Sequence, residues 1–183
     1  MSNVLMGILG VILFIGMALT GASYFGENVQ DGQAQAKATR IAADFALIGQ
    51  AVQDRVYATG TMQAAEASQA TAGARVASLV TDGYLKSTPA PPVGSSIYQL
   101  LDRTAGTNGQ AAAFLVLSIG STSEARATCY ALERLSGQSG TLPHIESGEA
   151  DLGGAMRSRP RAGCFRSITY NAYLAYTPVG SSV

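Results

Sequence analysis

The sequence predicts an α+β protein in which a long N-terminal helix packs on a small, mainly antiparallel sheet. An uncharged apolar segment runs directly into an amphipathic pattern, and no proline interrupts residues 1–58. Apolar and alternating segments of strand length follow in the second half of the chain. We expect three parts: residues 1–26 as the membrane-spanning half of the helix, 27–58 as its amphipathic half packed on the head, and 59–183 as a globular α+β head.

The first element is the uncharged segment. Residues 1–26 contain no charged side chain, and residues 4–25 are mostly apolar. As a helix this stretch is about 33 Å long, enough to cross a hydrocarbon core of about 30 Å. The alternatives are a buried soluble helix and a cleaved secretory signal, which would need a positively charged start that is missing here. We expect a retained anchor, and assign these residues to its buried surface: Ile8, Val11, Ile12, Leu13, Phe14, Ile15 and Leu19.

The second element continues the first. Apolar residues recur at spacings of three to five, with most charged residues on other faces, as far as Thr59-Gly60. The pattern predicts one continuous helix that reaches about Tyr57. If the helix is interrupted, Gly26 and Gly32 are the positions where we expect the break. Two helices joined near Gly26 remain the alternative. The residues expected to pack on the head are Ile41, Phe45, Ile48, Val52 and Val56.

The remaining elements are short. Alanine-rich sequence with apolar residues at helical spacing predicts a helix, and the three prolines after it predict an extended loop. A continuous apolar run predicts a central buried strand, and Thr122 or Ser123 can cap the helix that follows it. An alternating pattern predicts a half-buried last strand. The ranges are 61–82 (helix), 97–101 (strand), 104–110 (turn), 112–119 (central strand), 123–135 (helix), 137–163 (surface loop) and 167–176 (last strand).

Cys129 and Cys164 are the only cysteines. The first lies on the apolar face of the predicted helix and the second just before the predicted last strand. A disulfide between them would close the glycine-rich segment and contribute roughly 3–4 kcal/mol in the loop-entropy treatment. An exported head favours the bond, and two unrelated buried thiols are the alternative. Two cysteines without a supporting histidine are too few for a structural zinc site.

The composition excludes several classes of function. The net charge is zero and only 13% of residues are charged, which argues against nucleic-acid binding. The 47% of apolar residues argues against disorder. The common sequence motifs of nucleophilic, phosphate-binding and zinc-dependent enzymes are missing. We therefore expect no enzyme, no cofactor, no metal and no small-molecule substrate.

Three groups of polar or aromatic residues suggest weaker hypotheses. A histidine with nearby carboxylates has the ligands for a metal or a general base, but fits a solvated loop better. A basic cluster beside Cys164 fits a charged subunit-packing rim better than a site for DNA or another anionic partner. Three tyrosines suit an interface, although two of them can simply complete the sheet. The groups are His144, Glu146, Glu149 and Asp151; Arg157, Arg159, Arg161 and Arg166; and Tyr170, Tyr173 and Tyr176.

The order of these features resembles the type IV pilins, most closely their type IVb branch, which includes accessory pilins of bundle-forming and conjugative pili. A helix that is first apolar and then amphipathic precedes a loop, a small sheet and a C-terminal region with two cysteines. The stretch 112–135, an apolar strand running into a helix with a cysteine, is similar to part of type IVb heads. The sequence Val80-Thr81-Asp82-Gly83-Tyr84-Leu85, with prolines after it, resembles a phrase common in pilin-like proteins.

The resemblance implies a structural subunit of an extracellular pilus. Before assembly it would sit in the inner membrane with its head in the periplasm, and afterwards residues 1–26 would form the filament core. The implied partners are like or unlike pilin subunits, the inner membrane and the pilus assembly machinery, and the implied roles are cell adhesion or conjugation. The second hypothesis is a single-pass, membrane-anchored adaptor of a pilus, secretion or conjugation machine that does not enter the fibre.

The chain departs from the family at its start. Type IV prepilins have a short basic leader that ends in glycine, and the mature helix has glutamate at its fifth position. Cleavage after Gly7 would put Ile12 at that position, and an uncleaved start would put Leu5 there. An apolar core would then hold a terminal amine without a carboxylate, at a heavy desolvation cost. The resemblance therefore implies an accessory or minor pilin.

Overall fold

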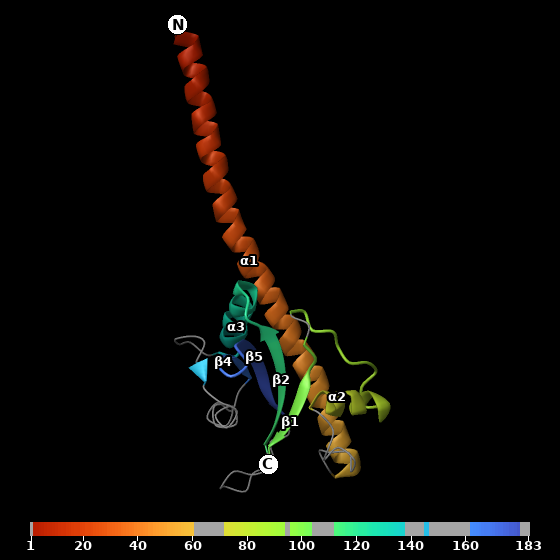
Figure 1. The fold of residues 1–183 in the computed structure, drawn as a ribbon. Coiled ribbons are helices and arrows are strands. Elements are labelled where there is room, and N and C mark those ends of the chain that lie inside the picture. Colours follow the sequence, from red (N-terminus) through yellow and green to blue (C-terminus); the bar gives the residue numbers. More distant parts are fainter. Residues whose placement is uncertain are drawn as a thin grey trace.

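The computed structural model shows a long helix that carries a small sheet and two shorter helices (Figure 1). It describes residues 2–60, 72–93, 96–103, 112–137, 145–146 and 162–179. The α+β class, with a long helix and a small, mainly antiparallel sheet, is confirmed. The elements are α1 (Ser2–Thr59), α2 (Ala72–Thr81), β1 (Gln99–Arg103), β2 (Ala112–Gly120), α3 (Ser123–Leu135), β3 (Ile145–Glu146), β4 (Gly163–Ser167) and β5 (Ala172–Val179).

α1 is a single helix of 58 residues. Its N-terminal half projects away from the head, and its C-terminal half lies along the sheet (Figure 1). The prediction of one continuous helix is confirmed, because the helix runs through Gly26 and Gly32, and the alternative of two helices joined near Gly26 is wrong. It ends where the sequence predicts, at Gly60, which adopts φ 71° and donates its N–H to the Val56 carbonyl at 2.8 Å. Glycine reaches this left-handed conformation at little steric cost.

The strand order in the described part of the sheet is β1-β2-β5-β4-β3. The pairs β1–β2, β2–β5 and β4–β5 are antiparallel, and β3 pairs with β4 in parallel. β2 lies inside the sheet with residues 113–117 buried, so the predicted central strand is confirmed. α3 occupies the predicted range, and the Thr122 hydroxyl accepts a hydrogen bond from the Ala125 N–H at 3.1 Å, as a helix cap should.

The single strand predicted over residues 167–176 is wrong. The chain turns between Ser167 and Ala172, which face each other in the β4–β5 pair. Asn171 makes the turn possible because it adopts φ 45°, a conformation that asparagine tolerates, and its N–H donates to the Ile168 carbonyl at 3.2 Å. The alternating pattern therefore spans a hairpin. Ile168 and Tyr170, which belong to the alternating pattern of the predicted strand, lie in the turn and are exposed.

Other boundaries also shift. The strand expected over 97–101 is β1, two residues further on. The uninterrupted loop expected over 137–163 is wrong, because β3 lies within it and β4 begins at its last residue. The two residues of β3 are too few to show a periodic pattern, and the glycine and arginine in β4 interrupt the apolar pattern of a strand. The helix expected over 61–82 is described from Ala72 as α2. The turn expected at 104–110, His144 and the arginines at 157, 159 and 161 lie outside the described residues.

The main core lies between α1, α3 and one face of the sheet, and includes Leu115, Leu117 and Ala175. The other face has a second buried cluster of Phe114, Val116, Phe165, Leu174 and Tyr176. Because both faces are buried, β5 has five consecutive buried residues instead of the half-buried alternation that the sequence predicts.

A buried tyrosine fixes the segment before β1 to α1. Tyr98 is 1% exposed, its hydroxyl donates to Asp44 Oδ2 at 2.6 Å, and its ring meets Phe45 edge-on with 5.8 Å between centroids. Burial, reinforced by the hydrogen bond to Asp44 and its negative charge, raises the pKa of Tyr98 far above the ordinary 10.0.

This shift predicts a loss of stability in alkali. The folded protein keeps the Tyr98 proton that the unfolded chain releases, so stability is fully present below the ordinary pKa of 10.0 and falls as the pH rises above it. Tyr98→Phe should make the free energy of unfolding less dependent on pH in that range. Urea unfolding of both proteins, from neutral pH to beyond the tyrosine pKa, measures this. Equal alkaline slopes would contradict the assignment.

Candidate assembly surface

Residues 11–15 and 17, in the projecting half of α1, expose apolar side chains on every face of the helix. Each residue advances about 100° around a helix, so five consecutive residues cover the whole circumference. In this part of α1, each side chain is between 51% and 76% exposed. Contiguous apolar surface of this kind marks a binding or membrane-contacting region. The residues are Val11, Ile12, Leu13, Phe14, Ile15 and Met17.

Five of the seven residues predicted for this surface are therefore placed on it, and the side chains of Ile8 and Leu19 lie outside the described part. Within the described residues, no helix is long and apolar enough to cross a membrane. The side chains of residues 2–10, 16 and 18–28 are not among those described.

The other half of α1 is fixed to the head. Ile41, Phe45, Ile48 and Val52 are at most 3% exposed, and Val56 packs partly buried against the same cluster. Spacings of three and four place them on one helix face, which the sheet and α3 cover.

Polar contacts add to this packing. Lys37 of α1 pairs with Glu124 at the start of α3. Arg55 pairs with Asp82 at 2.7 Å and donates to the Ser78 hydroxyl at 2.9 Å, which holds α2 against α1. α1 is thus secured to both shorter helices.

A disulfide joins α3 to β4. Cys129 and Cys164 are bonded at an S–S distance of 2.01 Å with 5.4 Å between their Cα atoms, so the predicted pair is confirmed and the two free thiols are excluded. Both residues are fully buried. The buried Glu133, one turn after Cys129, accepts the Cys164 N–H through Oε1. The covalent bond and this hydrogen bond therefore hold the same two elements together.

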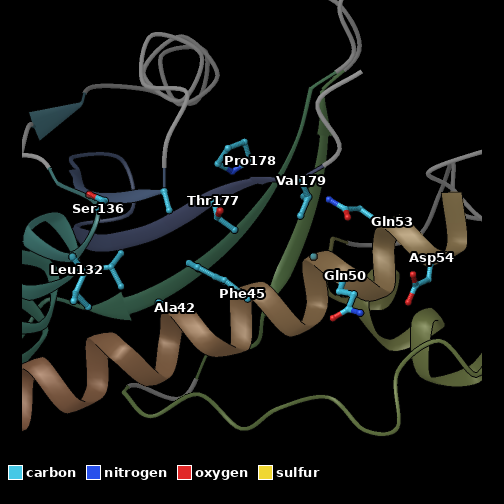
Figure 2. A pocket seen from close by; sticks show the side chains of 14 residues that line it. Ala42, Phe45, Gln50, Gln53, Asp54, Leu132, Ser136, Thr177, Pro178 and Val179 are labelled. Atoms are coloured by element: carbon cyan, nitrogen blue, oxygen red, sulfur yellow. The ribbon is translucent and has the colours of Figure 1, made fainter. Parts of the chain in front are cut away.

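Sequence reasoning missed a groove of about 620 Å³ between α1, the end of α3 and the end of β5. Figure 2 shows Leu132 at one end and Gln53 and Asp54 at the other, with Phe45 between them. Ala42, Ala46 and Gly49 line it on α1. Asp54 is the single ionisable side chain among the described residues of its wall, so the groove offers shape and apolar contact rather than acid–base chemistry.

A second missed feature, which we call the Arg–Tyr patch, comprises Arg126 and Tyr130 of α3 with Arg166 and Tyr173 of the hairpin. The Arg126 guanidinium lies 5.4 Å from the Tyr130 ring centroid, and its Nη2 donates to the Tyr130 hydroxyl at 3.1 Å. This hydrogen bond raises the pKa of Arg126. The Arg166 guanidinium lies 6.0 Å from the Tyr173 ring centroid. Such stacking orients a guanidinium and leaves it charged.

The three tyrosines predicted for an interface separate into two groups. Tyr173 and Tyr176 are buried in the sheet, as expected if two of them complete it, while Tyr170 in the hairpin turn is 51% exposed. Arg166, from the predicted basic cluster, is exposed and donates from Nη2 to Asn171 Oδ1 at 3.3 Å.

Among the described residues, no group of three or more histidine, cysteine or acidic side chains is placed to hold a metal ion. Comparison with known proteins found no similarity: no protein-family model matches the sequence, and no curated protein and no solved structure gives a significant match. Within the part of the chain that the structure describes, the exposed apolar residues of α1, the groove and the Arg–Tyr patch are surfaces open to a partner.

Proposed function

We propose that the chain is a structural subunit of an extracellular type IV pilus, of the type IVb kind, which assembles through the N-terminal half of α1. The observation that supports this most is the division of one continuous helix. Residues 11–15 and 17 in its first half expose apolar side chains all round, and one face of its second half is buried against the head. Such an apolar helix can lie in the lipid bilayer before assembly and pack against the same helix of other subunits afterwards.

Burial of the exposed apolar side chains of α1 would contribute a large free energy to membrane insertion or assembly. Burying one large apolar side chain contributes about 1.5–3 kcal/mol, so the six exposed residues from Val11 to Met17 would together contribute roughly 10 kcal/mol. Lipid tails and neighbouring apolar helices supply that burial almost equally well. Movement from the inner membrane into a filament core therefore exchanges one apolar environment for another, and is compatible with this surface.

The disulfide in the head is consistent with an exported protein. The lack of a carboxylate in residues 1–26 favours an accessory subunit. A buried disulfide is stable in the periplasm and outside the cell. Residues 1–26 contain no carboxylate that could neutralise a neighbour's amine inside an apolar core, where an unpaired charge is costly. A minor subunit in low copy, or one at a fibre tip, avoids repeating that cost along the fibre.

Phe14→Lys tests the proposal. Phe14 is 76% exposed near the middle of residues 4–25. A lysine at the centre of a membrane helix costs about 2.5–3.5 kcal/mol, so we expect roughly a hundredfold less protein in membranes and in sheared fibres. Quantitative mass spectrometry of membrane, soluble and sheared-fibre fractions measures this. The matched control is Tyr57→Lys, which places the same charge at an 87% exposed position of the other half of α1 and should fractionate like the wild type.

Two results would contradict the proposal. Unchanged fractionation of Phe14→Lys would mean that this half of α1 is not the assembling surface. A wild-type chain that membranes retain but sheared fibres never contain would instead support the anchored adaptor.

A further inference from the structure

The Arg–Tyr patch lies at the end of the head from which α1 projects. Gly120 pairs with Tyr173, so the β4–β5 turn and the β2–α3 connection share one end of the sheet. The ion pair of Lys37 with Glu124 attaches the start of α3 to α1. Figure 1 shows α3 beside α1 at the level where the projecting half leaves the head.

The patch presents two positive charges. The ion pairs within the described residues are Lys37–Glu124 and Arg55–Asp82, so neither Arg126 nor Arg166 has a carboxylate partner there. Both are exposed, and both are oriented by a tyrosine ring. Ile168, in the turn that follows Arg166, is exposed and adds apolar surface to the hairpin. Oriented guanidiniums next to apolar surface suit a carboxylate on a partner.

The same chain exposes a carboxylate at this end. Asp31 lies on α1 one turn before Ala34, which is 4% exposed, so it stands just outside the head. Asp31 is itself exposed and belongs to neither of the described ion pairs. The chain has no net charge, so its positive patch is balanced by acidic residues elsewhere. That complementarity favours a second copy as the partner.

We propose that the Arg–Tyr patch binds Asp31 of a second copy of this chain. The inference rests on the proposed function, because it needs helices that lie side by side. Asp31 precedes Lys37 by six residues, and Lys37 marks the level of the start of α3, so the two levels differ by about 9 Å along α1. An axial offset of about 10 Å between neighbouring copies therefore brings Asp31 of one to the level of Arg126 of the other.

This offset agrees with the apolar surface. It is small compared with the projecting half of α1, which is about 50 Å long at 1.5 Å per residue, so neighbouring apolar halves still overlap along most of their length. Apolar contact then supplies most of the association energy, and the charged contact selects the offset between copies.

Charge reversal in the full chain, purified in detergent, tests the inference. Asp31→Arg, and Arg126→Glu with Arg166→Glu, should each weaken self-association about tenfold, since each places like charges together. The chain with all three substitutions should recover the wild-type association constant. An equal mixture of the Asp31→Arg chain and the Arg126→Glu/Arg166→Glu chain should also recover it, because each chain then meets the opposite charge on the other. Analytical ultracentrifugation gives the constants. Lys86→Glu, which reverses an exposed charge in the segment after α2, is the control and should associate like the wild type.

The outcomes separate this inference from the proposed function. A wild-type chain that stays monomeric, even at high concentration, removes the assembling function and this contact with it. Self-association that all the reversals leave unchanged overturns the contact alone. A third outcome would also overturn the contact with Asp31. If the arginine variants lose binding to vesicles of anionic lipid, and Asp31→Arg does not change self-association, the patch binds lipid headgroups instead.

Discussion

Replacing Cys129 and Cys164 by alanine is expected to lower the free energy of unfolding by about 4 kcal/mol, from the loop-entropy treatment of a bond between residues 35 apart. The bond joins α3 to β4, and β4 has a β3 pairing of only two residues on its outer side. Without the bond the unfolded chain gains conformational freedom, and this gain lowers the free energy of unfolding. Urea unfolding followed by circular dichroism measures the difference.

Reduction of the wild-type protein is the control, because it breaks the bond without changing the side-chain volume of either cysteine. It should reproduce most of the loss seen in the double variant. A loss below about 1 kcal/mol in both would mean that packing, with the hydrogen bond from the Cys164 N–H to Glu133, holds α3 to β4 without help from the disulfide.

Phe45→Ala is expected to lower the free energy of unfolding by about 3–5 kcal/mol. Phe45 is 3% exposed, meets Tyr98 edge-on, and lies on the buried face of α1. It also forms part of the wall of the groove (Figure 2), so water can reach the space that its removal leaves. For that reason we expect a value near the lower end of the range. Denaturant unfolding measures it.

Leu47→Ala is the matched control. Leu47 lies two residues further along the same helix and is 50% exposed, so its truncation removes a smaller apolar group from a surface position. Its loss should stay below about 1 kcal/mol. Equal losses for the two variants would mean that the predicted packing face of α1 does not anchor the head.

Much of the fold is predictable because its signals are local. The lack of proline and the helical spacing up to Val56 predict α1 and its end at Gly60. Thr122 predicts the start of α3, where its hydroxyl caps the helix, and the apolar run predicts β2. The disulfide is predictable because the chain has only two cysteines, one on the apolar face of a predicted helix and one just before a predicted strand.

The missed parts depend on contacts between distant residues. The β4–β5 turn depends on the left-handed conformation of Asn171, whereas the alternation on both sides of it continues as if one strand ran through. The Arg–Tyr patch combines Arg126 and Arg166, and it forms because the disulfide and the pairing of Gly120 with Tyr173 bring α3 and the hairpin together. The groove depends on how closely three elements approach, which no periodicity in one segment can report.

The continuity of α1 also determines how the protein would respond to tension. A pull on the projecting half is transmitted along one rod to the side chains that α1 buries in the head, with no flexible joint at which the force could dissipate. Because the pull acts along the helix axis, it loads the contacts of Ile41, Ile48 and Val52 together, in shear. Shear requires these contacts to fail at once, whereas a sideways pull would peel them apart one by one. The fold is therefore mechanically strongest along the direction in which its longest helix points.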